Sequence, residues 1–68
     1  MTVGERIAWH RQLMGYTISQ LANMAGISRQ CLWKYENNVA DPKLFNAMCL
    51  ADALGISLDY LARGVARK

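Results

Sequence analysis

Signals that start and stop short helices recur along the whole chain and constrain its fold more than any other feature. Two pairs have the spacing of a capping box, in which paired side chains satisfy the free backbone N–H groups of a helix start: Thr2 with Glu5, and Thr17 with Gln20. Three further residues are favourable N-caps: Ser28, Asp41 and Ser57. Residues that readily adopt the left-handed conformation found at helix ends follow each start: Gly15, Gly26, Asn37-Asn38, Gly55 and Gly64.

These signals predict five helices, over residues 3–14, 17–25, 28–36, 41–54 and 57–62, with Pro42 at the first position of the fourth. No segment has the alternating pattern of a strand. Helices this short are unstable alone, so they must share a core. The sequence therefore predicts an all-α fold, a compact five-helix domain over residues 1–63 followed by a basic tail at 64–68.

Helical periodicity identifies the side chains for that core. At about 100° per residue, the first helix places four side chains on one stripe: Val3, Ile7, His10 and Met14. The fourth helix has a broader apolar arc: Leu44, Ala47, Met48, Leu50, Ala51 and Leu54. The rest of the chain adds Tyr16, Leu21, Ala22, Ile27, Leu32, Tyr35, Ile56, Leu58 and Leu61. Together these side chains are enough for one core.

Several classes of protein are excluded by what the chain lacks. It has no run of about 18 apolar residues and no apolar signal segment near Met1, so we expect a cytoplasmic, nucleoid-associated protein without membrane contact. Cys31 and Cys49 are too isolated for a disulfide framework or a metal site, and no cofactor is expected. His10 is the only histidine and has no partner suited to catalysis, so we expect no enzyme.

The net charge of +3 arises at the C-terminal end. Within residues 1–62 the basic side chains are balanced in number by the acidic ones, and the excess comes from Arg63, Arg67 and Lys68. Total charge therefore gives only weak support for binding to nucleic acid, and the placement of the charges matters more.

Residues 17–36 have the pattern of two short helices joined by a turn that contains Gly26. Ala22 is small enough for a close helix crossing, and Ile27 can fill the corner between the helices. Leu32 and Tyr35 anchor the second helix to the core. This combination is typical of a helix-turn-helix.

Several segments, in this order and spacing, resemble the Cro and phage-repressor family, also called the Xre family: Leu21-Ala22, residues 26–30, residues 35–37, Pro42 and residues 50–58. The resemblance extends over nearly the whole chain. It implies a lambda-repressor-like fold that binds duplex DNA, with the helix over residues 28–36 as the recognition helix.

The two faces of this recognition helix differ in the way that the resemblance implies. Arg29, Gln30 and Lys34 fall on one arc of about 140°, together with Trp33, and apolar anchors occupy the other side. Arginine can bond guanine, and glutamine can bond adenine, through two hydrogen bonds in the major groove. We expect these four side chains to contact bases. For Trp33 two alternatives are open: contact with thymine methyls or sugars, or packing onto the domain beside Asn37.

The resemblance also implies contacts to the DNA backbone, from Arg11, Thr17, Ser28, Asn37, Asn38 and Lys43. Arg11 and Glu36 occupy positions of an ion pair between the first and third helices, and Arg11 either reaches a phosphate as well or has only a structural role. The chain departs from the family pattern at Ile18, where glutamine is usual, at Asn38, where glycine is usual, and in the non-basic loop at residues 39–41.

Apolar side chains are also expected on outward-facing positions. Phe45 and Cys49 lie on the outer face of the fourth helix, and Tyr60 replaces a usually acidic residue. Such clustering indicates a protein interface, here a homodimer. Trp9 and Leu13 lie opposite the Ile7 stripe and either join this interface or receive the last helix.

The sequence thus predicts a sequence-specific transcriptional regulator, most simply a dimeric repressor that reads a two-fold-symmetric operator. A phage Cro-like or immunity repressor, or the controller of a restriction–modification system, has this profile. The alternative is a protein-interaction module, such as an antitoxin that neutralises a protein partner and binds DNA for its own regulation.

Overall fold

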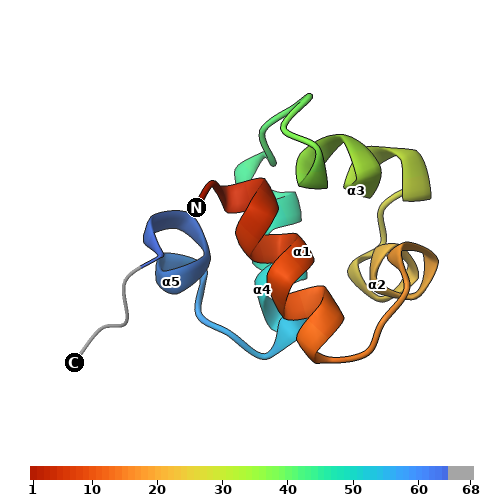
Figure 1. Cartoon of the computed structure of the whole chain (residues 1–68), viewed down its shortest axis with the longest axis horizontal. Helices are drawn as coiled ribbons and strands as arrows, with labels where there is room; N and C mark the ends of the chain where they lie inside the picture. Colours follow the sequence, from red (N-terminus) through yellow and green to blue (C-terminus); the bar gives the residue numbers. More distant parts are fainter. Residues whose placement is uncertain (65–68) are drawn as a thin grey trace.

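Five α-helices make up the part of the chain that the computed structural model describes, residues 1–64, and these residues form no strand. The helices are α1 (Val3–Leu13), α2 (Ile18–Ala25), α3 (Arg29–Glu36), α4 (Leu44–Leu54) and α5 (Leu58–Arg63). Figure 1 shows α1 and α4 in the middle, with α2 and α3 on one side and α5 on the other. The predicted all-α, five-helix architecture is confirmed. Among residues 1–64, no helix is long and apolar enough to cross a membrane.

Both predicted capping boxes are present. At α1 the Thr2 hydroxyl accepts a hydrogen bond from the Glu5 N–H (3.0 Å), and the Glu5 carboxylate accepts one from the Thr2 N–H (2.8 Å). Thr17 and Gln20 make the same two bonds at α2, at 3.0 and 2.8 Å. The hydrogen bond from Thr2 lowers the pKa of the Glu5 carboxyl. These local bonds explain why the starts of α1 and α2 could be predicted from four residues.

The predicted start of the fourth helix is wrong. Residues 41–43 are not helical, and α4 begins at Leu44 with the extended Lys43 as its N-cap, without a side-chain capping bond. Pro42 is half-buried and lines an apolar groove beside Val3 instead of opening the helix. The first helical bond of α4 runs from the Ala47 N–H to the Lys43 carbonyl, at 2.8 Å. The local N-cap signal at Asp41 therefore does not determine where this helix begins.

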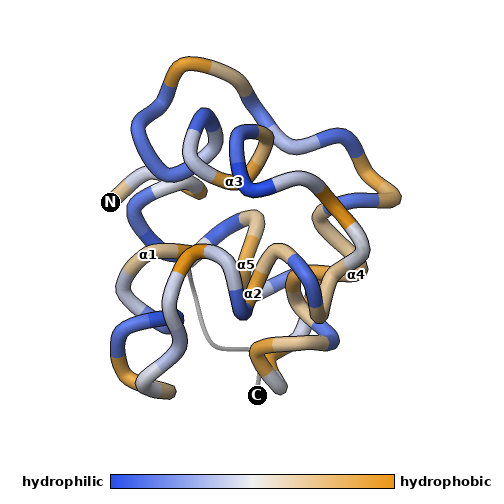
Figure 2. The backbone as a smooth tube through the Cα atoms, turned by 90° about the vertical axis from the view of Figure 1, so that its right-hand side faces the viewer, coloured by the Kyte–Doolittle hydropathy of each residue, from blue (hydrophilic) through white to orange (hydrophobic). Residues whose placement is uncertain are grey.

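The centre of the core takes one fully buried side chain from each helix: Ile7, Leu21, Leu32, Leu50 and Leu61. Burying an aliphatic side chain of this size contributes roughly 1.5–3 kcal/mol. Smaller residues, among them Ala22 and Ala51, fill the space between the helices. Helices α3 and α4 differ in composition. Figure 2 shows that hydrophilic residues are frequent along α3, whereas apolar residues predominate along α4.

Three residues assigned to the core by periodicity are exposed instead. Met14 is 50% exposed because it lies at the C-cap of α1, beyond the packed turns. Leu44 (68%) is the first residue of α4, and Met48 (45%) lies about 100° around the helix from Ala47. The buried face of α4 is the narrower set Ala47, Leu50, Ala51 and Leu54.

A candidate nucleic-acid interface on helix three

The turn between α2 and α3 is built from three consecutive residues. Gly26 has the left-handed conformation, with φ of 73°, and reverses the chain at the end of α2. The Ile27 N–H donates to the Ala22 carbonyl at 3.0 Å, and the Ile27 side chain packs against the core. The Ser28 hydroxyl then accepts from the Cys31 N–H at 3.0 Å and caps α3. The two helices are thus joined in a helix-turn-helix.

Helix α3 has one face that packs inward and one that is open. Leu32 is fully buried and Tyr35 is 5% exposed. Arg29, Gln30 and Lys34 are exposed, as the sequence led us to expect for residues that bind a ligand outside the domain. The exposed face of α3 thus carries two positively charged side chains and one carboxamide. These groups can form hydrogen bonds with base edges and with phosphates.

Trp33 lies on the same open side and is 50% exposed. It is absent from the side chains that pack against the core within residues 1–64. The Asn37 side-chain amide donates to the Trp33 backbone carbonyl at 2.9 Å, so the contact with Asn37 involves the backbone of Trp33. About half of the Trp33 surface is therefore free to contact a ligand.

Arg11 and Glu36 hold the far end of α3 to α1. The Arg11 Nε and Nη2 atoms donate to the two carboxylate oxygens of Glu36 at 2.8 and 3.0 Å. A third bond runs from Nη1 to the Tyr16 carbonyl at 2.9 Å, in the turn before α2. Both side chains are mostly buried, with exposed fractions of 14% and 5%. These bonds connect the C-terminal end of α3 to α1 and to the turn before α2, so they help to set the orientation of α3 in the domain.

Tyr35 is a second anchor of α3, through a residue that sequence reasoning missed. The Asn46 amide of α4 donates to the Tyr35 hydroxyl at 2.9 Å. Burial raises the pKa of the tyrosine, and a hydrogen bond with Cys31 raises it further. At Gly4, a side chain would collide with the Tyr35 carbonyl, so only glycine lets α1 approach the end of α3. No sequence pattern marks either the polar Asn46 or the glycine in the first turn of α1 for such a role.

The residues suggested for the DNA backbone occupy three places around α3. Ser28 and Lys43 line one shallow depression together with Gln30 and Lys34, and Asp41 lies at the same place. Thr17 is exposed at the start of α2. Asn38, with φ of 60°, accepts a bond from the Thr2 hydroxyl at 2.8 Å, and it lies with Asn37 at the end of α3. The structure thus groups Ser28 and Lys43 with the open face of α3.

Residues 7–61 match the family model for a helix-turn-helix. The chain belongs to the Cro/C1-type helix-turn-helix family. It is 39% identical over 61 residues to the prophage-derived transcriptional regulator YonR of Bacillus subtilis, and 39% identical over 61 residues to the phage transcriptional repressor RstR of Vibrio cholerae. Each alignment covers 90% of this chain but 56% and 54% of those proteins, so the chain spans about half of their length.

A solved structure agrees with this membership. The P22 c2 repressor bound to a synthetic operator superposes with a TM-score of 0.91 and 31% sequence identity, over 96% of this chain and 98% of that one. The resemblance to phage repressors inferred from the sequence is therefore confirmed. As a Cro/C1-type domain, the chain has the fold that in the P22 c2 repressor is found together with operator DNA.

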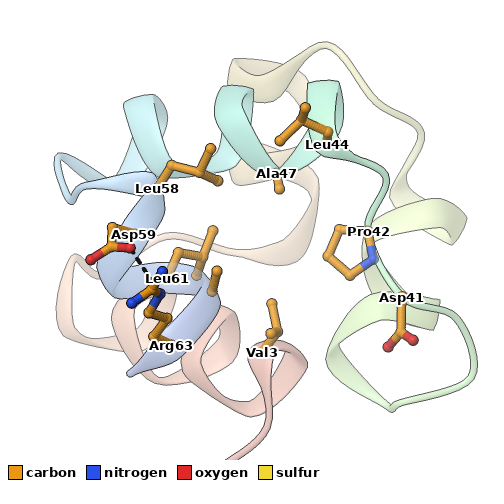
Figure 3. Close-up of a pocket in the computed structure, with 10 residues that line it drawn as sticks. Val3, Asp41, Pro42, Leu44, Ala47, Leu58, Asp59, Leu61 and Arg63 are labelled. Carbon is orange, nitrogen blue, oxygen red and sulfur yellow. Dashed lines mark ion pairs between the residues drawn. The ribbon is translucent and has the colours of Figure 1, made fainter. Parts of the chain in front are cut away.

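Away from α3, this Cro/C1-type domain exposes an apolar patch at the start of α4, formed by Leu44, Phe45 and Met48, with Phe45 at 73% exposure. The patch adjoins an open groove of about 880 Å³. Figure 3 shows Leu58 and Leu61 on one side of the groove and Pro42 and Leu44 on the other.

The other residues predicted for a protein interface are less accessible than Phe45. Cys49 is half-buried and packs against the core. Tyr60 is half-buried, and its hydroxyl lies 2.9 Å from Nε2 of His10, with the two rings edge-on. Trp9 and Leu13 remain 51% and 63% exposed.

Helix α5 is held by Arg6, a residue whose role sequence reasoning missed. Its guanidinium donates to the carbonyls of Leu61 (2.9 Å) and Ala62 (3.2 Å) in α5, and to that of Met1 (2.8 Å). Arg6 is 7% exposed, and a positive charge at a helix C-terminus is favourable. Gly64 has φ of 76°, and a side chain there would strike the Arg6 guanidinium. The predicted basic tail continues through residues 65–68, which lie outside the described part of the chain.

Proposed function

We propose that this chain binds duplex DNA in a sequence-specific manner as a transcriptional regulator of the repressor type. The observation that carries the proposal is the open face of α3, where Arg29, Gln30 and Lys34 project from a helix that Leu32 and Tyr35 anchor. Membership of the Cro/C1-type family supports it. Binding at a promoter would block transcription by occupying the site.

Arg29 and Gln30 are the principal base readers in this proposal. They are the first two residues of α3, and in a helix-turn-helix the N-terminal part of the recognition helix enters the major groove. Arg29 would bond a guanine, and Gln30 an adenine. Lys34 lies one turn further along the same face and would contact a third base pair. Each paired contact of this kind contributes about 1–3 kcal/mol of discrimination.

The DNA backbone contacts come from residues that flank this face. Ser28 and Lys43 share the depression beside α3, and Thr17 caps α2 at a helix N-terminus, where backbone N–H groups attract phosphate. Asn37 and Asn38 provide amides at the other end of α3. All of these contacts position the domain and carry no sequence information. For Arg11, three bonds within the domain favour a positioning role over a phosphate contact.

We further propose a homodimer that reads a two-fold-symmetric operator. The apolar patch of Leu44, Phe45 and Met48 supports this proposal, and Cys49 lies one turn beyond Phe45 on the same helix. Isolated exposed apolar residues need no explanation, but three on one short helix segment indicate an interface. In a two-fold dimer the half-sites would be centred about one helical turn of DNA, roughly 34 Å, apart.

Selection of binding sites from a random duplex library at about 150 mM salt tests the proposal. We expect enrichment of one site made of two inverted half-sites. The variant Arg29→Ala with Gln30→Ala is the control: both side chains are exposed, so the fold should be retained while that site is no longer enriched. Enrichment of a single half-site would contradict the dimer, and a library without any enriched sequence would contradict specific DNA binding.

A further inference from the structure

The fold does not account for the position of Trp33. Its indole is 50% exposed in the middle of α3, whereas the inward face of that helix is formed by Leu32 and Tyr35. Within residues 1–64, the indole makes no hydrogen bond and no ring contact. A large aromatic ring without a partner on a polar face is expected where a ligand will cover it.

Helical geometry places that ring between two of the base readers. Taking Arg29 as zero, Trp33 lies at about 40° around the helix axis and Gln30 at about 100°. Trp33 is therefore inside the arc that faces the floor of the groove, not at its edge, where the sugars and phosphates lie. It also lies about 6 Å along the axis from Arg29, a distance of about two base-pair steps.

The floor of the major groove offers a single apolar group. Guanine, adenine and cytosine present hydrogen-bond donors and acceptors there, whereas thymine adds its 5-methyl group. An indole has one donor and otherwise an apolar surface, so it matches a methyl group better than any polar base edge. A sugar contact would need the ring at the edge of the arc.

We propose that Trp33 is a specificity-determining residue that recognises thymine through its 5-methyl group, within about two base pairs of the one read by Arg29. This inference rests on the proposed function, because it requires α3 to occupy the major groove. It adds to that function a defined base, a defined chemical group on the base, and the side chain that detects it.

Replacing thymine by deoxyuridine in the selected operator tests the proposal, because the two differ only by the methyl group. We expect one thymine in each half-site whose replacement weakens binding of the wild-type protein about three- to fivefold, the value of one buried methyl group. The variant Trp33→Ala should bind both operators equally at that position. Trp33→Phe, which keeps an apolar ring, should retain part of the preference.

Trp9→Ala is the matched control, since Trp9 is exposed to the same degree (51%) but lies on α1. It should keep the methyl preference of the wild type, because that preference depends only on the helix in the major groove. Circular dichroism and the thermal unfolding midpoint of each variant verify that the exposed substitutions leave the fold intact.

Three outcomes would overturn the inference. Wild-type binding could be insensitive to deoxyuridine at every position, or Trp33→Ala could keep the full methyl preference. An equal loss on all duplexes with Trp33→Ala would identify a sugar contact instead. Each of these results leaves the proposed function intact if Arg29→Ala still alters base preference, whereas a library without an enriched site would refute both.

Discussion

At the scale of single residues, the side chains of α3 divide between those that hold the helix and those that are free to bind. Leu32 and Tyr35 are buried, whereas Arg29 and Lys34 are exposed within the same two turns. Substitution of the free residues should therefore change binding with little change in stability, which makes their effects interpretable.

Replacing Arg29 by alanine should cost about 1–3 kcal/mol of binding free energy on the selected operator and relax the preference at one base position. The expected reason is the loss of the proposed two-bond contact between Arg29 and guanine. Competition titrations with operators altered at each position measure both effects. Equal losses on operator and random duplex would assign Arg29 to the DNA backbone instead.

Lys43→Ala should behave differently, because a phosphate contact carries no base information. We expect weaker binding to every duplex and a plot of log K against log salt that is shallower by about one unit. Titrations at several salt concentrations measure the slope. An unchanged slope would remove Lys43 from the set of phosphate contacts.

At the scale of elements, the ion pair between Arg11 and Glu36 connects α3 to α1 and so helps to orient the proposed recognition helix. Glu36→Gln keeps the shape of the side chain but leaves a mostly buried guanidinium without its counter-charge. We expect a loss of roughly 3 kcal/mol in the free energy of unfolding, as for other broken buried pairs. Urea denaturation measures this loss.

A second ion pair, between Arg63 and Asp59, is a control for that experiment. The Arg63 Nε atom lies 3.1 Å from the Asp59 Oδ1 atom, and the two side chains are 70% and 30% exposed. Arg63→Ala should cost less than about 1 kcal/mol, because solvent screens an exposed pair. Similar losses of unfolding free energy in the two variants would show that burial does not strengthen the pair of Arg11 and Glu36.

The sequence predicts the boundary of a helix well where the interactions that set this boundary join residues close together in the chain. The starts of α1 and α2 follow from capping boxes that span four residues, and both are found as expected. The start of α4 differs from the expectation: Pro42 lines a groove together with residues of α1 and α5, an arrangement that no local pattern reveals. The exposure of Leu44 and Met48 has a related explanation. Periodicity gives the direction of each side chain on the helix, but it does not show how much of the helix surface the neighbouring helices cover.

The candidate site shows the same division. The exposed arc of α3 could be predicted from helical phase, and the partners Arg11 and Glu36 from family resemblance. The contacts of Arg6, Asn46 and Gly4 could not, because each joins segments distant in the sequence through a hydrogen bond or a close approach. Such pairs become visible only when the packing of the helices is known.

At the scale of the whole molecule, the apolar patch on α4 lets the proposed dimer be tested directly. Phe45→Asp places a charge on a residue that is 73% exposed, so the monomer should fold normally. We expect sedimentation equilibrium to show a dimer for the wild type and a monomer for the variant, with binding to an isolated half-site retained.

Val39→Asp is the control for that variant, since Val39 is similarly exposed (62%) but lies in the loop after α3. It should sediment as the wild type does. A Phe45→Asp protein that remains dimeric would move the interface to another surface.

The arrangement of one fully buried side chain per helix has a consequence for how the domain can fail. Because every helix contributes to this shared core, we expect the domain to unfold in a single cooperative transition, as most small domains do. The slowest amide protons of all five helices should then exchange with a single opening free energy. A cell could dispose of such a domain by unfolding and degrading it entirely.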